Sequence, residues 1–504
     1  MRPGRRHERK ERMRKKPNIV VFMTDQQLGD TILPGHPAKT PNVDRLRQAG
    51  LQFTQAFTAS PHCCPSRATF FTGLYPTQHN IWNNVEVDNA LSRDFYDGVT
   101  TFPEMLQKAG YHNMFSGKWH VSGLRGPLDC GFHEVIREQM SNYGRTGGSN
   151  QPLNVTWERA YSDPARIDTD ASPKEFGRIL RPGYPTYYQF GEDPNPFHDT
   201  DTVEMACERL RNYRQDEPFF LYVGTVGPHD PYNPPQEFID LYDPADIRLP
   251  ESFDDPMEEM PALYRRTREA FKLTEEEHKE SIRRYLAFCS YEDHLFGKLL
   301  DTLEEQRLMD DTIVIYLTDH GDYLGAHGLW AKGLPCYREA YQLCAVVGGA
   351  GVGPRGQSCD ELVALADFAP TILELAGLPA GDKMVGRSLV PFLNGEKVCD
   401  WRTEVYTQTN GNEIYGIQRA VWNKKWKLVY NSFDYDLLFD LENDPLELHN
   451  VIDRPENREV VRQLWKKLWT FARRTGDTAI SPYIMVALAP YGPGITLEKP
   501  AKPV

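Results

Sequence analysis

The sequence contains no hydrophobic run of the roughly 18 residues that a membrane-spanning helix requires. Its first stretch, MRPGRRHERKERMRKK, is strongly basic and has no apolar core, so it does not resemble a secretory signal. Cysteines are few for a disulfide-stapled protein: there are nine, an odd number, in 504 residues, and their spacing is irregular. These absences predict a chain without membrane segments, reduced and located in the cytoplasm.

An excess of positive charge is also missing, because 71 acidic residues outnumber 57 basic ones and give a net charge of -14. We therefore expect no nucleic-acid partner. The composition is that of a globular protein, 40% hydrophobic and 25% charged, with enough length for one large and one smaller core. We predict a basic tail, a large domain that holds the catalytic site, a smaller C-terminal subdomain and an irregular tail, at residues 1–17, 18–395, 396–480 and 481–504.

Strand-like and helix-like segments alternate along the large domain, which is typical of a mostly parallel sheet flanked by helices. Strands are predicted at 18–24, 111–117, 218–226 and 311–318, and a long amphipathic helix at about 275–306. Three helices are expected to end at a left-handed glycine, at Gly50, Gly110 and Gly377. We predict an α/β sandwich with a large mixed, mostly parallel sheet.

The pattern changes after about residue 395. Three segments there look like antiparallel strands, with a hairpin turn at 423–425 and a helix near 456–474. The C-terminal subdomain is therefore predicted to combine an antiparallel sheet with a helix.

Polar residues follow each predicted strand of the large domain. Because ligands bind outside the carboxyl ends of the strands in open α/β sheets, we expect these side chains to converge. Carboxylates, an amide oxygen and an imidazole would suit a divalent cation, while Lys118 and Lys332 would supply charge for an anionic substrate. The residues concerned are Asp25 and Gln26, Lys118 and His120, His229, and Asp319 and His320.

The segment CCPSR, Cys63 to Arg67, followed by ATFFTG, resembles the C-x-P-S-R...T-G signature of the sulfatases, which are members of the alkaline phosphatase superfamily. Other segments resemble sulfatases in the same order along roughly residues 18 to 450. They are GKWH (117–120), PHDPY (228–232), TDHGDYLGAHGLWAKG (318–333) and LFDLENDPLELHN (438–450).

In the sulfatases the first cysteine of this signature is oxidised to formylglycine, whose aldehyde is hydrated to a diol. Cys63 has proline at +2 and arginine at +4, as the maturation motif requires, whereas Cys64 would have serine at +2. The resemblance therefore identifies Cys63 as the formylglycine precursor and Cys64 as the variable position. It also implies a partner, either a formylglycine-generating enzyme or an anaerobic maturation enzyme.

The resemblance assigns further roles residue by residue. Arg67 would orient the diol, His229 would protonate the leaving oxygen, and His120 would serve the diol hydroxyl when sulfate is eliminated. Lys118 and Lys332 would hold the charge of the sulfate. The metal would be bound by Asp25, Gln26, Asp319, His320 and the modified Cys63.

The metal implied is one divalent ion, with Ca²⁺ favoured. Many sulfatases have aspartate and asparagine where this chain has Gln26 and His320, so Mn²⁺ and Mg²⁺ are alternatives. Asn84 and His327 are weaker candidates for contacts at the site, and the segment 121–217 is expected to line the leaving-group pocket.

The activity implied is hydrolysis of a small sulfate monoester, an aryl, steroid or carbohydrate sulfate, to an alcohol or phenol and inorganic sulfate. The runner-up is a phosphonate monoester or phosphodiester hydrolase of the same superfamily, because those enzymes, like choline-sulfatase-like enzymes, share the metal-site substitutions. GKWH favours sulfate, since the phosphonate hydrolases have uncharged hydroxyl residues where this chain has Lys118 and His120. A third alternative is a non-catalytic relative that binds anions with Cys63 unmodified.

Overall fold

The computed structural model describes residues 16–87, 89–139, 174–179, 187–412, 414–480 and 489–497. Nearly all of the predicted basic tail and most of the predicted irregular C-terminal tail lie outside these residues. The same is true of 140–173, a large part of the segment expected to line the leaving-group pocket. Among the described residues, no helix combines the length and the apolar character needed to cross a membrane.

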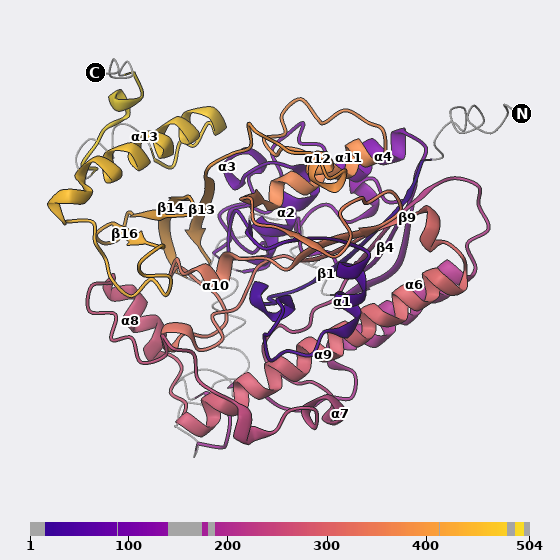
Figure 1. The fold of residues 1–504 in the computed structure, drawn as a ribbon, viewed down its shortest axis with the longest axis horizontal. Helices are drawn as coiled ribbons and strands as arrows, with labels where there is room; N and C mark the ends of the chain where they lie inside the picture. The colour runs from indigo at the N-terminus through magenta and orange to yellow at the C-terminus, as the bar shows by residue number, and fades with distance from the viewer. Residues whose placement is uncertain are drawn as a thin grey trace, which may run out of the picture.

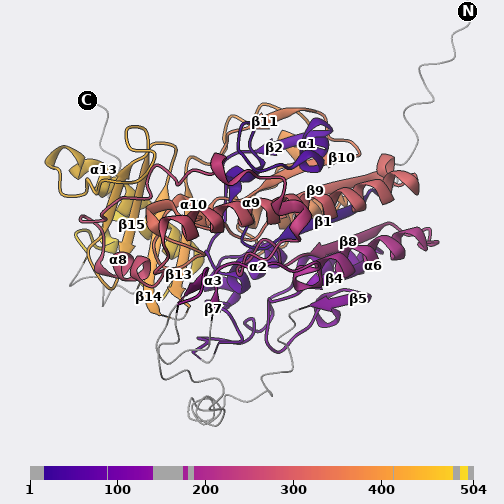
Figure 2. The ribbon, with the colours of Figure 1, turned by 90° about the horizontal axis from the view of Figure 1, so that it is seen from below.

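An eight-stranded sheet forms the centre of the large domain, in the order β11-β2-β10-β9-β1-β8-β4-β5 (Figure 2). Only β10 runs antiparallel to its neighbours, while the other pairs are parallel. The predicted mixed, mostly parallel sheet is confirmed. Its strands in chain order are β1 Asn18–Thr24, β2 Gly50–Phe53, β4 His112–Lys118, β5 Glu134–Gln139, β8 Phe219–Gly224, β9 Thr312–Thr318, β10 Ala345–Gly349 and β11 Gln357–Cys359.

Helices cover both faces of this sheet (Figure 1). The alternation of side chains along β1 explains how two cores form around one strand. Ile19, Val21 and Met23 face the core shared with α2, α4 and α11, whereas Val20 and Phe22 face the core shared with α1, α6 and α9. These helices are α1 Pro41–Gln48, α2 Cys63–Thr72, α4 Phe102–Lys108, α6 Asp199–Arg211, α9 Glu275–Glu305 and α11 Phe368–Leu375.

The remaining α-helices and strands that the structure describes between residues 16 and 395 are short. Five are helices: α3 Pro76–His79, α7 Gln236–Ile239, α8 Ala262–Glu269, α10 Arg338–Tyr341 and α12 Val390–Leu393. Four are strands that pair two by two: β3 Ala56–Phe57 with β12 Val363–Ala364, and β6 Arg178–Ile179 with β7 Tyr187–Tyr188.

One of the three predicted glycine caps is wrong. Gly110 and Gly377 have φ of 87° and 75°, as a left-handed cap requires, but α1 ends at Gln48 and Gly50 begins β2. A Cβ atom on Gly50 would lie 2.1 Å from the carbonyl oxygen of Val347 in β10. Glycine is needed at position 50 because two strands approach closely there, and not because a helix ends.

The second sheet is antiparallel, in the order β13-β14-β15-β16, and stands beside α2 and α3 (Figure 1). The predicted hairpin turn is present: the Asn423 side-chain oxygen accepts hydrogen bonds from the backbone N–H groups of Lys425 and Trp426, both at 2.8 Å. Helix α13 shares a hydrophobic core with the sheet. The elements are β13 Val405–Gly411, β14 Tyr415–Trp422, β15 Trp426–Asn431, β16 Leu437–Asp440 and α13 Arg458–Thr475.

Candidate active site

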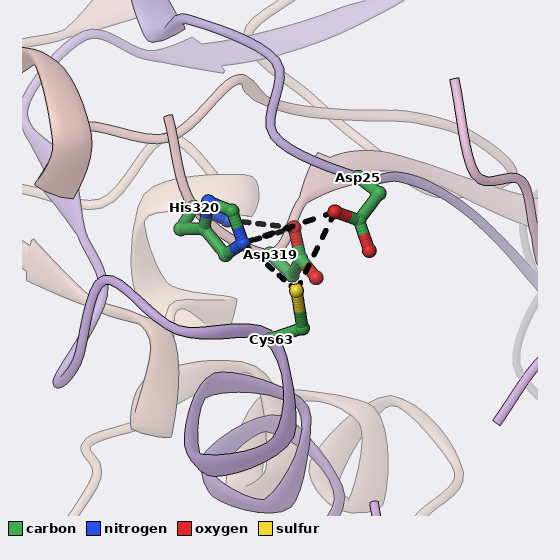
Figure 3. Close-up of side chains that lie close together, drawn as sticks. All are labelled: Asp25, Cys63, Asp319 and His320. Atoms are coloured by element: carbon green, nitrogen blue, oxygen red, sulfur yellow. Dashed lines mark hydrogen bonds and ion pairs between the residues drawn. The ribbon is translucent and has the colours of Figure 1, made fainter. Parts of the chain in front are cut away.

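Four of the predicted metal-site residues meet where the central strands end and helix α2 begins. Asp25 follows β1 directly, Asp319 and His320 follow β9, and Cys63 is the first residue of α2. Figure 3 shows the four side chains pointing toward one another. All four are buried, and one donor atom from each lies within 4.8 Å of the others.

The spacing of these atoms suits a metal ion. The sulfur of Cys63 lies 3.2 Å from Nε2 of His320 and 3.6 Å from Oδ1 of Asp25. His320 Nε2 lies 3.8 Å from Oδ1 of Asp25 and from Oδ1 of Asp319. Metal bonds of about 2.0–2.4 Å place neighbouring donors roughly 3 to 4 Å apart.

The tautomer of His320 also suits a ligand role. Its Nδ1 lies 2.9 Å from the carbonyl oxygen of Gly321, so this nitrogen carries the proton and donates it. When the ring is neutral, Nε2 is the unprotonated nitrogen, and it faces Cys63, Asp25 and Asp319. A backbone carbonyl that fixes the free nitrogen of a ligand histidine is a common outer contact of metal sites.

Arg67 links the carboxylates of Asp25 and Asp319. Its Nε donates to Asp319 Oδ2 at 2.8 Å, and one terminal nitrogen donates to Asp25 Oδ2 at 2.9 Å. The other terminal nitrogen donates to the Tyr222 hydroxyl at 2.8 Å. Tyr222 was missed by sequence reasoning, since a tyrosine inside a strand carries no motif. Arg67 is completely buried, so its guanidinium fixes both carboxylates in a rigid fork.

Lys118, the last residue of β4, donates a short hydrogen bond to Asp25. Although burial opposes ionisation of Asp25, Lys118 and Arg67 hold its pKa well below the ordinary value. Burial likewise opposes ionisation of Cys63, but Lys118, Lys332 and His320 lower its pKa well below that of a free thiol. This corner of the site therefore favours negative charge at residue 63.

The two adjacent cysteines have opposite environments. Burial raises the pKa of Cys64 to about 11. Its sulfur accepts a hydrogen bond from the backbone N–H of Val85 at 3.5 Å and lies 3.8 Å from a Glu86 oxygen. Cys64 thus lies outside the group formed by Asp25, Asp319 and His320, and its surroundings disfavour a thiolate.

A second predicted group lies beside the first and consists of His229, Lys332 and Gln26. The Lys332 ammonium lies 2.7 Å from Nε2 of His229 and also donates to the side-chain oxygen of Gln26. The Gln26 amide nitrogen donates to Asp322 at 2.6 Å and to Asp230 at 3.0 Å. The Gln26 side chain thus connects Lys332 to two carboxylates, and its role as a metal ligand stays a prediction.

The weaker candidates have other partners. Asn84 accepts a hydrogen bond from the backbone N–H of Cys64 at 3.1 Å, so it caps the start of α2. His327 lies 2.7 Å from a carboxylate oxygen of Asp255, and its ring stacks on Tyr337 at a centroid distance of 3.6 Å.

A buried pair of carboxyl groups, also missed from the sequence, supports the loop that carries His229. Asp199 accepts hydrogen bonds from the backbone N–H groups of Val226 at 3.0 Å and Gly227 at 2.8 Å. Burial raises the pKa of Asp199 to about 7 and that of Glu292 well above its ordinary value. Since Asp199 already accepts two N–H donors, we assign the proton that the buried pair retains to Glu292.

This pair should make stability fall as pH rises. Unfolded glutamic acid ionises near pH 4, while the folded pair keeps its proton to about pH 7 or above, so the proton is lost from the unfolded state first. Glu292→Gln removes the titrating group and keeps a side chain of nearly the same shape. Between pH 5 and pH 9, we expect the free energy of unfolding of the variant to rise by about 1 to 4 kcal/mol relative to that of the parent, as measured by urea unfolding. A difference in unfolding free energy between variant and parent that stays constant with pH would contradict the assignment. So would an equal difference between the exposed control Glu276→Gln and the parent.

The comparisons with known proteins agree with the fold. The family model described as Sulfatase matches residues 17–378, and a second model, N-sulphoglucosamine sulphohydrolase, C-terminal, matches residues 325–474. A choline-sulfatase of Rhizobium meliloti is 32% identical over 461 residues, covering 87% of this chain and 83% of its own. An arylsulfatase of Clostridium perfringens is 28% identical, covering 90% of this chain and 94% of its own.

Solved structures show the same fold. The phosphonate monoester hydrolase of Agrobacterium radiobacter superimposes with a TM-score of 0.73 at 22% identity, covering 92% of this chain and 97% of its own. A protein solved with its substrate D-glucosamine-2-N,6-O-disulfate gives a TM-score of 0.71 at 21% identity, covering 92% and 99%.

The fold and these matches define a sulfuric ester hydrolase of the alkaline phosphatase superfamily. Within that superfamily, the chain belongs to the sulfatase family.

Proposed function

We propose that the chain hydrolyses a small sulfate monoester to an alcohol or phenol and inorganic sulfate, with formylglycine formed from Cys63 and one divalent metal ion. The observation that carries this proposal is the convergence of Asp25, Cys63, Asp319 and His320, with a buried lysine beside Asp25. Residues 18–395 would form the catalytic domain and 396–480 the C-terminal subdomain. The maturation enzyme and a cytoplasmic location remain part of the proposal.

The metal would be held by Asp25, Asp319, His320 and the modified residue 63, with Gln26 as a further candidate. It would stabilise negative charge on oxygen and lower the pKa of a hydroxyl on residue 63. Ca²⁺ remains the favoured ion, and the imidazole of His320 keeps Mn²⁺ and Mg²⁺ as alternatives.

The chain's own side chains would handle the substrate charge and the protons. The Lys118 and Lys332 ammonium groups would contact the sulfate oxygens, since Lys118 is buried, Lys332 is partly buried, and both charges lower the pKa of Cys63. His229 Nδ1 lies 2.6 Å from the backbone carbonyl oxygen of Asp230, which orients the ring so that Nε2 faces Lys332. From that position His229 would pass a proton to the leaving oxygen.

Asp319→Asn should weaken metal binding and lower activity together. Each carboxylate oxygen of Asp319 is already fixed, Oδ1 by the backbone N–H of Gln26 at 3.1 Å and Oδ2 by Arg67 at 2.8 Å. The asparagine side chain would carry no charge, and its amide would present either an N–H donor or a neutral oxygen to Arg67. We expect metal content, measured by plasma emission spectroscopy, to fall about 10-fold or more. Unchanged metal content would show that Asp319 is not a ligand.

The alternative, a phosphonate monoester or phosphodiester hydrolase, has support from the structural similarity to the phosphonate monoester hydrolase. That similarity shows the fold alone, whereas the curated relatives include a choline-sulfatase and an arylsulfatase. The deciding experiment assays aryl esters of sulfate, phosphate and phenylphosphonate with Ca²⁺, Mn²⁺ and Mg²⁺ in turn. We expect the highest kcat/KM for the sulfate with at least one metal. A higher kcat/KM for the phosphonate with every metal would replace our proposal by the alternative.

A further inference from the structure

A cavity of about 190 Å³ lies between the part of the chain that forms the large sheet and the part that forms the second sheet with α13. Tyr75, Asp367 and Arg387 line it from the first part, and Arg402 and Arg474 line it from the second. None of the residues assigned above to the candidate active site lines this cavity. A molecule bound here would therefore contact both parts of the chain without touching the catalytic residues.

The two carboxylates that line the cavity already accept several hydrogen bonds. Asp367 accepts from both terminal nitrogens of Arg402, each at 2.6 Å, and from two backbone N–H groups at 2.7 and 2.8 Å. These four donors fill the roughly four acceptor positions of a carboxylate. Glu404 accepts from the Lys467 ammonium and from the Tyr406 hydroxyl. The acceptors of the cavity are thus largely occupied, which disfavours a cationic ligand.

Two donors of the cavity, in contrast, have no acceptor. Tyr75 is only 5% exposed and its ring packs against Phe471 at a centroid distance of 4.8 Å, yet its hydroxyl forms no hydrogen bond with the described residues. Burial raises the pKa of this hydroxyl to about 12, so it keeps its proton and can donate it. Arg474, in the last turn of α13, lies over the Phe471 ring and forms no ion pair with a described carboxylate.

The charge and the size of the cavity favour a small anion. Three arginines and two carboxylates line it, which gives a formal charge of +1. Because Glu404 is also paired with Lys467, which does not line the cavity, the charge within it is more positive than this count. A volume of about 190 Å³ lies below the roughly 300–1,000 Å³ of sites for drug-sized ligands and suits an inorganic ion. Guanidinium groups bind oxyanions through charge-assisted hydrogen bonds.

We propose that this cavity binds a small inorganic oxyanion, sulfate or phosphate, which accepts hydrogen bonds from the Tyr75 hydroxyl and the Arg474 guanidinium. The site is separate from the catalytic one, so it does not depend on the proposed function. Tyr75 directly follows the turn that ends α2, whereas Arg474 belongs to α13. The bound anion therefore joins α13 to the helices of the large sheet, and it stabilises the folded chain because the unfolded chain lacks the site.

Isothermal titration calorimetry with sodium sulfate and with sodium phosphate, at constant ionic strength, tests the site. We expect at least one of the two anions to bind the parent with a Kd of about 1 mM or below. Tyr75→Phe and Arg474→Gln should each weaken that binding about 10-fold or more, since each removes a donor to a charged acceptor. Arg473→Gln is the matched control, because it removes the same charge from the next position of α13 and does not line the cavity. Anion bound at the catalytic site is unaffected by these variants, so the difference from the parent reports on this cavity alone.

Thermal melts give a second measurement. Sulfate stabilises proteins in general because it is excluded from their surface, so the informative quantity is the difference between variants. Replacing sodium chloride by the bound anion at equal ionic strength should raise Tm more in the parent and in Arg473→Gln than in Tyr75→Phe or Arg474→Gln.

The melts in chloride show whether each variant is folded, and Arg474 lies at an exposed position whose substitution should not prevent folding. The proposal is overturned if neither anion binds the parent, or if Arg474→Gln binds both as tightly as the parent does. It is also overturned if Arg473→Gln weakens binding as much as Arg474→Gln, because the effect would then come from surface charge and not from the cavity.

Discussion

Cys63→Ala should abolish hydrolysis of an aryl sulfate, while Cys64→Ala should retain most of it. Only Cys63 has the proline and the arginine in the register that conversion to formylglycine requires. The structure adds a physical reason, because the Cys63 sulfur lies 3.2 Å from His320 and 3.6 Å from Asp25. We expect kcat/KM to fall by roughly 10³-fold or more in Cys63→Ala, since no other side chain replaces the nucleophile.

Cys64→Ala is the matched control, because it removes an equally buried thiol from the next position of the same helix. The Cys64 sulfur contacts the backbone of Val85 and the Glu86 carboxylate, so its loss should cost some stability. Thermal melts of both variants separate misfolding from loss of chemistry. Equal loss of activity in two folded variants would leave the choice of Cys63 without support.

Lys118→Ala should lower kcat/KM for an aryl sulfate about 30- to 1000-fold. A buried ammonium that contacts a sulfate oxygen contributes roughly 2 to 4 kcal/mol in the transition state. Lys118 is fully buried and already held by Asp25, so it is oriented before substrate arrives. Replacing Lys118 by tyrosine together with His120→Thr should shift the relative preference toward phosphonate and phosphodiester substrates.

The control for this prediction is Lys108→Ala, which removes a lysine from the exposed end of α4. Metal content should be measured in parallel, because Lys118 also contacts Asp25. If Lys118→Ala hydrolyses aryl sulfates as fast as the parent, the GKWH segment (117–120) does not bind the sulfate group through Lys118. The sulfatase activity would then lose its main advantage over phosphonate hydrolysis.

The large sheet could be predicted because its central strands are short apolar runs rich in β-branched residues. The predicted 18–24 strand matches β1 at both ends, and 311–318 differs from β9 by one residue. The convergence of Asp25, Asp319 and His320 followed from the same pattern, since each comes directly after a strand. Gly50 could not be interpreted correctly, because close approach of β2 to β10 is a property of the folded sheet.

The supporting residues of the site were beyond sequence reasoning for a related reason. Tyr222 lies inside a strand, and Asp199 and Glu292 lie on helices 93 positions apart. Their roles depend on contacts with Arg67 and with the loop that carries His229. The surroundings of His120 were equally hidden, since only the folded chain places its Nε2 2.7 Å from Oε1 of Glu86. Motifs identify groups that react, whereas the groups that orient them are defined by packing.

The most direct test of the account is a mass spectrum of the tryptic peptide that spans residues 48–67 and contains both cysteines. The protein should be purified from cells that contain a formylglycine-generating enzyme. Conversion of CH₂SH to CHO lowers the mass by about 18 Da, and fragment ions assign the loss to one position. We predict the loss at residue 63 and an intact thiol at residue 64. An unmodified Cys63 in a preparation that hydrolyses aryl sulfates, or a loss at residue 64, would contradict the central claim.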